Sequence, residues 1–199
     1  HSLRDLGIAV STGPVVDFRL KAHIHQIQEP SSVPLIYPAH VQDGYVVWPK
    51  TNGRKPNAID DDIETRKWLM PQGYYTLTRR FSSKEERRRI FASVYDPTHI
   101  AADWIGFENH LNVFHAQGKG LSPTLARGLA LYLNSTIVDQ FFRMFNGHTQ
   151  VNATDLRALP YPSREALVTL GAEAPADKLP PQEVIDALVE RLIFQDAQD

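Results

Sequence analysis

The spacing of hydrophobic residues changes near residue 122. Before this point, short runs of β-branched and aromatic residues alternate with polar residues or are cut by turns. After it, apolar residues recur at four-residue steps. A two-residue period is typical of strands, whereas a period near 3.6 is typical of helices. The pattern therefore predicts a strand-rich first part followed by a helical part.

Several short strands are expected in the first part. Residues 6–19 predict two strands joined by a Ser-Thr-Gly-Pro turn, and residues 33–41, 44–50, 74–83 and 87–97 each predict one more. Strict alternation in 74–83 sends Arg79 and Arg80 to opposite faces. Residues 51–73 are polar and indicate a surface connection, with one possible helical stretch near Asp60 to Trp68.

The helical part is expected to begin at Ser122, an N-cap residue followed by Pro123 at the first helical position. The apolar series predicts one long helix over 122–145, or two helices broken near Asn134-Ser135. Gly147 stands where a left-handed C-cap is favoured. The polar loop that follows is expected to leave through an apolar strand towards Pro160.

These elements predict an α+β fold: a mixed or antiparallel sheet of short strands, a long packed helix and a C-terminal helix. That last helix is expected over 180–195, after a Pro-containing linker. We divide the chain into a domain over residues 1–171 and a linker with the C-terminal helix over residues 172–199.

Composition narrows the classes of function. The 199 residues include no cysteine, which excludes disulfides, thiolate catalysis and cysteine metal sites, and fits a reducing compartment such as the cytoplasm. No apolar run approaches the roughly 20 residues that span a bilayer. We expect a cytoplasmic protein without membrane association. The chain starts at His1-Ser2 rather than Met, so we expect a fragment.

Charge is divided unevenly along the chain. Residues 44–95 carry 11 Lys or Arg against 6 Asp or Glu, whereas residues 150–199 carry 4 against 9. This asymmetry favours an anionic partner facing the basic middle, although solvated surface charge without a partner explains the count equally well.

Several motifs carry a resemblance: VSTGPVVDFR, LTRRFSSKEERRR, GFENHLN, and LYLNSTIVDQFFR followed by HTQVNATDLRALPYP. Over roughly Leu6 to Gly171 the chain resembles the C-terminal target-recognition region of adenine-specific DNA methyltransferases of type II restriction–modification systems, in the branch described as TaqI-like. The resemblance implies a module that recognises duplex DNA, with a methyltransferase catalytic domain in the same or another chain.

Such enzymes carry, upstream, a glycine-containing loop for S-adenosylmethionine and an Asn-Pro-Pro-[Tyr/Phe] motif that holds the flipped adenine. No Asn-Pro-Pro occurs here, and we find no glycine cluster that follows a strand to open a helix. We therefore expect no catalytic residues and no cofactor in this chain, with S-adenosylmethionine in the parent enzyme. The alternative is a protein-interaction module that docks a catalytic domain or partner subunit without reading DNA.

The resemblance gives the polar residues candidate roles. Amides and imidazoles can hydrogen-bond base edges, and Arg or Lys can contact phosphates. The same amides can instead bond their own loop, and a structural turn at 108–110 would pack His110 inside. Our DNA-binding candidates are Arg19, Arg79, Arg80, Lys84, Asn109, His110, Asn146, His148, Gln150 and Asn152.

Metal-dependent chemistry is not expected. His23 and His25 form a His-x-His pair, but no carboxylate–histidine spacing of the zincin kind accompanies them. The acidic run Asp60-Asp61-Asp62 lacks the partners of a nuclease motif. We therefore predict no metal site.

Overall fold

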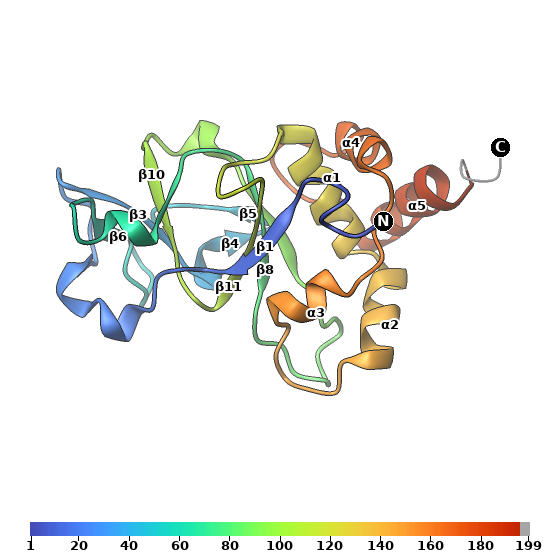
Figure 1. The fold of residues 1–199 in the computed structure, drawn as a ribbon, viewed down its shortest axis with the longest axis horizontal. Coiled ribbons are helices and arrows are strands. Elements are labelled where there is room, and N and C mark those ends of the chain that lie inside the picture. Colours follow the sequence, from blue (N-terminus) through green and yellow to red (C-terminus); the bar gives the residue numbers. More distant parts are fainter. Residues whose placement is uncertain (196–199) are drawn as a thin grey trace.

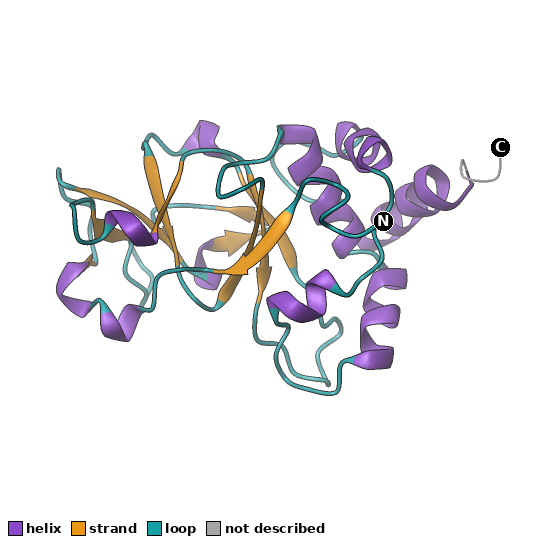
Figure 2. Ribbon diagram, viewed as in Figure 1, coloured by secondary structure: helices purple, strands orange, loops and turns teal. Residues whose placement is uncertain are grey.

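Strands and helices separate towards opposite ends of the molecule. The computed structural model describes residues 1–195. Two sheets of short strands occupy one half, and the longer helices gather at the other (Figure 1). Figure 2 shows the same division by secondary structure, with short helical turns also beside the strands. The predicted α+β class is confirmed.

The larger sheet has six strands in the order β1-β11-β8-β9-β5-β4. All neighbours in it are antiparallel except β5 and β9. Its strands are β1 (Ala9–Thr12), β4 (Val41–Gln42), β5 (Tyr45–Val46), β8 (Tyr75–Arg79), β9 (Ala92–Tyr95) and β11 (Leu111–His115).

The second sheet has five strands in the order β2-β6-β3-β10-β7. Only β3 and β10 are parallel, so both sheets are mixed. Its strands are β2 (Ile24–His25), β3 (Ser32–Ile36), β6 (Ala58–Asp60), β7 (Leu69–Pro71) and β10 (Trp104–Phe107). The Phe107 ring meets Tyr75 and Tyr95 of the larger sheet edge-on, with ring centroids 5.2 and 5.5 Å apart. These aromatic contacts join the two sheets through a common core.

Two predictions in the strand half are wrong, and two strands were missed. Residues 6–19 do not form a hairpin, because β1 pairs with β11 and residues 17–19 form a 3-10 turn (η1, Asp17–Arg19). The polar stretch 51–73 contains β6 and β7, and its expected helix is only the 3-10 turn η4 (Arg66–Trp68). Strands β10 and β11 were not expected around residues 104–115. The remaining short turns are η2 (Lys21–His23), η3 (Pro38–His40) and η5 (Pro97–His99).

The long helical pattern resolves into two helices, α1 (Pro123–Leu133) and α2 (Thr136–Phe145), so the two-helix alternative is confirmed. Ser122 Oγ accepts from Leu125 N at 3.3 Å, as an N-cap should. Asn134 causes the break. Its side chain accepts from Ala92 N at 3.1 Å and donates to the carbonyls of Ala92 and Ala130, each at 2.8 Å. The end of α1 is thereby fastened to β9.

Beyond α2 the chain is helical rather than extended. The expected apolar strand is wrong, because α3 (Ala153–Arg157) begins directly after Asn152 and α4 (Arg164–Ala172) follows the proline-containing turn. The predicted left-handed cap at Gly147 is also wrong: Asn146, in an extended conformation, ends α2, and Gly147 has no positive φ.

The predicted C-terminal helix is confirmed as α5 (Gln182–Val189), continued by a π-helical turn η6 (Glu190–Gln195). The proposed boundary at residue 171 falls in the last turn of α4. Beyond it, Ile185 and Val189 join the core that also buries α1. Residues 196–199 of the predicted second segment lie outside the described residues. Its independence as a domain stays a prediction.

Helices α1 and α4 touch through two glycines. A Cβ at Gly128 would lie 1.8 Å from the Leu167 carbonyl oxygen, and one at Gly171 would lie 1.7 Å from the Thr124 carbonyl oxygen. Only glycine therefore allows α1 and α4 to approach each other this closely.

Candidate nucleic-acid interface

Three segments that are far apart in sequence meet below the larger sheet: residues 79–89, the turn 108–110 and the loop 146–152. Their backbones are joined directly. Ser82 N donates to Thr149 O at 3.1 Å, Val151 N to Arg80 O at 2.7 Å, and Arg80 N to His110 O at 2.8 Å. The structure therefore brings together nine of the ten candidate residues, all except Arg19.

A cleft of about 500 Å³ opens where these segments meet, and we call it the central cleft. Arg79, Phe81, His110 and Thr149 line it, together with Tyr37 and Lys55 from the opposite side. Aromatic rings beside cationic and polar groups can stack on and hydrogen-bond planar anionic ligands.

His110 is held in the cleft by a buried carboxylate. Glu108 is fully buried, and its Oε1 lies 2.5 Å from His110 Nδ1 while its Oε2 accepts the His110 backbone N–H at 2.9 Å. The His110 side chain keeps 49% of its surface exposed and lies 5.2 Å from the Phe81 ring. His110 is therefore not packed inside. The contact at Nδ1 leaves Nε2 able to meet a ligand.

The loop 146–152 is built around Arg89. This guanidinium is 1% exposed; Nε donates to Ser82 Oγ at 3.0 Å, and Nη2 donates to Asn146 Oδ1 at 3.2 Å and to the His148 carbonyl. Asn146 is buried too, and its Nδ2 donates to Gln150 O at 3.1 Å and to Asp155 Oδ2 at 3.0 Å. For Asn146 the geometry favours the alternative in which the amide bonds its own loop.

The other loop candidates differ from Asn146. His148 is exposed and Gln150 is half-buried. Within residues 1–195 the side chains of His148 and Gln150 have no hydrogen-bond partner. Asn152 is the N-cap of α3, and its backbone N–H donates to Asp155 Oδ2 at 2.9 Å. Gln150 pairs with Phe81 across an isolated antiparallel bridge, which fixes its backbone beside the central cleft.

The basic candidates are partly neutralised. Arg79 forms an ion pair with Glu86, and its guanidinium lies 4.2 Å from the centre of the Phe91 ring. The backbone N–H of Ser83, assisted by Arg79, lowers the pKa of Glu86. Arg80 donates to the Asn109 carbonyl at 3.3 Å. Among the ion pairs of the described chain, none gives Arg80, Lys84 or Arg87 a carboxylate.

Helix α2 anchors the basic segment, residues 79–89. Arg143 donates to the carbonyls of Lys84 and Glu86 at 3.0 and 2.8 Å, and its Nε donates to Asp139 at 2.8 Å. Lys84 is exposed at the tip of the basic segment. The backbone that carries the positive side chains is therefore held both by Arg143 of α2 and by the loop 146–152.

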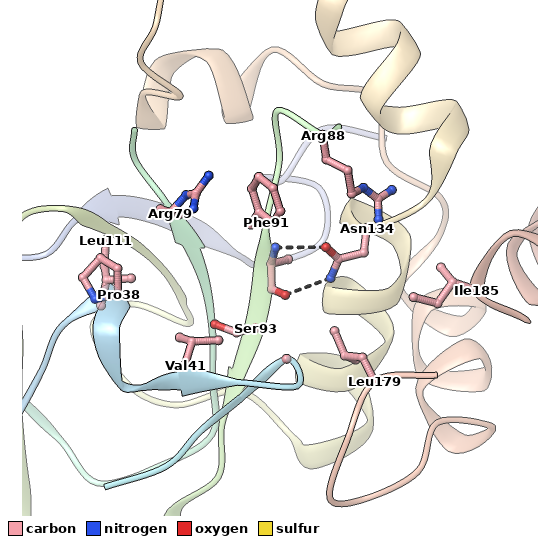
Figure 3. A pocket seen from close by; sticks show the side chains of 12 residues that line it. Pro38, Val41, Arg79, Arg88, Phe91, Ser93, Leu111, Asn134, Leu179 and Ile185 are labelled. Carbon is pink, nitrogen blue, oxygen red and sulfur yellow. Dashed lines mark hydrogen bonds between the residues drawn. The ribbon is translucent and has the colours of Figure 1, made fainter. Parts of the chain in front are cut away.

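A second cavity, of about 340 Å³, lies behind Arg79 between the β4–β5 turn and α5. Figure 3 shows Arg79 and Arg88 on either side of Phe91, with Asn134 bonded to the backbone of β9 and Leu179 and Ile185 closing the far side. Arg88 donates to Gln182 of α5. This cavity is where the C-terminal segment contacts the sheet.

Two residues that line the central cleft were not predicted, and one predicted residue lies away from it. Tyr37 and Lys55 line the central cleft, with Lys55 Nζ 5.0 Å from the Tyr37 ring centre. Lys55 was counted only within the basic excess, while Tyr37 carried no signal. Arg19 is exposed on η1, over the Phe18 ring, and does not line the central cleft.

Two glycines, Gly118 and Gly120, lie in the loop between β11 and α1, the position that a strand–loop–helix cofactor site would use. Both have backbone explanations. Gly118 has φ +80 in a tight turn closed by Ala116 and Lys119, and a Cβ on Gly120 would lie 2.7 Å from Gly73 Cα. These glycines do not fit a cradle for S-adenosylmethionine.

No helix within residues 1–195 combines the length and apolar character needed to cross a membrane. No protein-family model matches the chain.

Two curated proteins are similar to it. The type II methyltransferase M.PstI of Providencia stuartii is 54% identical over 166 residues, which are 83% of this chain and 33% of that protein. The type II methyltransferase M.BsuBI of Bacillus subtilis is 52% identical over 171 residues, 86% of this chain and 34% of that protein. The chain thus spans about one third of the length of the type II methyltransferases that it matches.

Proposed function

We propose that this chain is the part of an adenine-specific type II DNA methyltransferase that recognises duplex DNA. The observation that carries the proposal is the joining of three segments that hold nine candidate residues, beside a cleft lined by cationic and aromatic side chains. The chain is also more than half identical to a portion of two type II methyltransferases. The TaqI-like character of the module and a cytoplasmic location are part of the same proposal.

Each group has a role in this proposal. Arg80, Lys84 and Arg87 contact phosphates and set the register, whereas Gln150, His148 and His110 reach base edges. Asn146 supports the loop from inside. The cofactor and the reacting adenine are bound by a catalytic domain outside this chain, which takes the base out of the duplex.

Salt dependence tests the proposal. In a full-length enzyme, alanine substitution of both Lys84 and Arg87 should weaken binding to cognate and random duplexes alike. The slope of log affinity against log salt should shrink by roughly 0.9 for each phosphate that the variant no longer neutralises. An unchanged slope would exclude this loop from the DNA interface.

A second role, docking of the catalytic domain, is favoured by an exposed apolar face on α2. Ile137, Phe141, Met144 and Phe145 are between 38% and 76% exposed and fall at helical spacing on one side. Ile137 and Phe141 also line an apolar groove of about 310 Å³ with Tyr161. Exposed apolar surface of this kind marks interaction sites.

The occupant we propose is the part of a longer methyltransferase that lies outside this chain. His1 N donates to Tyr161 O at 2.8 Å and Tyr161 N donates to His1 O at 2.9 Å, so His1 lies at the rim of this groove. The two relatives have about two thirds of their length outside the match.

Docking is tested separately from DNA binding. Replacing Phe141 and Met144 by serine in a full-length enzyme should split one calorimetric unfolding transition into two, while Val184→Ser, on the exposed side of α5, should not. A transition that stays single in the double variant would reject this face as the docking site.

A further inference from the structure

Histidine and carboxylate side chains gather at the edge strand of the five-stranded sheet, at the end of the molecule away from the helices (Figure 1). His23 ends η2, His25 lies in β2, and Asp60 ends the neighbouring β6. Asp62 follows in the next turn. The pairing of β2 with β6 therefore brings together groups more than 30 positions apart in sequence.

Three possible ligand atoms converge. His23 Nδ1 lies 3.2 Å from Asp60 Oδ2 and 3.9 Å from Asp62 Oδ2, and the three residues offer atoms that all lie within 4.8 Å of one another. A tetrahedral ion with bonds of about 2.0–2.2 Å separates its ligands by roughly 3.3–3.6 Å. The spacing fits a small divalent ion between the three atoms.

The second oxygen of each carboxylate is already bound. His25 Nε2 lies 2.6 Å from Asp60 Oδ1, and Asp62 Oδ1 accepts the backbone N–H groups of Glu64 and Thr65 at 2.8 and 2.9 Å. Each Oδ2 is therefore left to face His23. Nδ1 carries at most one proton, so hydrogen bonding to His23 cannot satisfy both oxygens.

A further carboxylate lies near the outer nitrogen of each imidazole. His23 Nε2 lies 3.6 Å from Glu64 Oε2, and His25 Nδ1 lies 3.6 Å from Glu29 Oε1. A carboxylate on the far nitrogen orients a metal-binding imidazole and raises its basicity.

The net charge of the cluster also favours a bound cation. Among the ion pairs of residues 1–195, none joins Glu29, Asp60, Asp62 or Glu64 to Lys or Arg. Even with both imidazoles protonated, the four carboxylates keep two uncompensated negative charges, which a divalent cation would neutralise.

We propose that His23 Nδ1, Asp60 Oδ2 and Asp62 Oδ2 bind a divalent transition-metal ion, for which Zn²⁺ suits the mixed nitrogen and oxygen set. Water completes the coordination, His25 fixes Asp60, and Glu64 orients His23. The ion is structural. It ties η2 and the turn after β6 to the edge of the sheet. The proposal departs from the expectation of no metal, which considered only spacing along the sequence, and it does not depend on the proposed DNA-binding function.

Zinc titration of the chelator-treated chain, followed by calorimetry and thermal unfolding, tests the site. We expect one Zn²⁺ bound per chain and a higher melting temperature, because a ligand that binds only the folded state stabilises it. Asp62→Asn retains the oxygen that accepts the turn's N–H groups, and it should lower Zn²⁺ affinity at least tenfold. Glu64→Gln should lower it roughly 10–100-fold.

Two controls separate the site from general zinc binding by surface groups. Asp61→Asn removes an adjacent carboxylate that pairs with Arg66, and His99→Gln removes an exposed imidazole near Asp96; both should bind Zn²⁺ normally. The proposal is overturned if the chelator-treated chain binds no Zn²⁺ at millimolar concentration. It is equally overturned if Asp60→Asn and Asp62→Asn, shown to be folded by circular dichroism, bind it as tightly as the unaltered chain.

Discussion

The buried guanidinium of Arg89 donates to Asn146 Oδ1 at 3.2 Å, although the two residues lie 57 positions apart. This bond joins the basic segment to the polar loop after α2. Arg89 also bonds Ser82 Oγ and the His148 carbonyl, so one cation organises both sides of the candidate interface. The most buried arginine of the basic segment is thus structural, while its neighbours carry the exposed charge.

Asn146→Ala should destabilise the chain and weaken all DNA binding together. The substitution removes the acceptor of Arg89 and two donor bonds, and leaving a buried polar group unsatisfied costs about 1–3 kcal/mol. Denaturant unfolding measures this loss. His148→Ala, on an exposed residue of the same loop, is the control and should leave stability within about 0.5 kcal/mol. Equal stability of the two variants would show that Asn146 does not hold the loop.

Gln150→Ala should change target choice more than general affinity. Its side-chain amide lacks a partner within residues 1–195, whereas its backbone is fixed by the bridge to Phe81. A bidentate amide–adenine pair discriminates by roughly 1–3 kcal/mol. Methylation of the cognate site relative to single-base variants, measured in a full-length enzyme, should fall towards equality without a change in melting temperature. A lower melting temperature with unaltered discrimination would assign Gln150 to the scaffold.

Arg80→Ala should weaken binding to all duplexes more than Arg79→Ala does. Glu86 already neutralises Arg79, while Arg80 has no carboxylate partner in the described chain. For the same reason, Glu86→Gln should strengthen binding to random DNA, since it releases the Arg79 charge. Fluorescence anisotropy at several salt concentrations measures all three. Arg66→Ala, whose charge pairs with Asp61, is the matched control. Identical losses for Arg79→Ala and Arg80→Ala would contradict this assignment.

Stability should fall as the pH drops below about 6.5, because burial lowers the pKa of His40 and of His115. A depressed histidine pKa means that the unfolded chain binds more protons between the folded and unfolded values, so acid favours unfolding in this window. His40 Nδ1 accepts from Tyr37 N at 3.0 Å, and His115 Nδ1 accepts from Gly118 N at 2.9 Å. Protonation abolishes both bonds.

Urea unfolding between pH 5 and 8 measures this effect. Each histidine contributes at most about 1.4 kcal/mol per pH unit. His115→Gln should reduce the slope, whereas His99→Gln, on an exposed histidine, should not. A flat profile between pH 5 and 7 would mean that neither histidine is held neutral by the fold.

The sequence determined the elements whose signals are local. Four-residue apolar spacing, Ser122 and Pro123 marked the helical part, and alternation marked β8. The Asn134-Ser135 break could be named as an alternative because such residues compete with helix hydrogen bonds. The motifs of the resemblance also include the segments that meet at the central cleft.

Tertiary structure decided the rest, because strand pairing and side-chain convergence depend on distant residues. Strand β1 pairs with β11 instead of forming a local hairpin. The polar stretch 51–73 joins the second sheet, because β6 pairs with β2 and β3 and β7 pairs with β10. Spacing could not reveal that Arg89 is buried, that Glu86 neutralises Arg79, or that His23 faces Asp60 and Asp62. Burial and charge compensation arise only when the chain has folded, so the sequence supplied the chemical groups and the fold determined which of them remain free to bind.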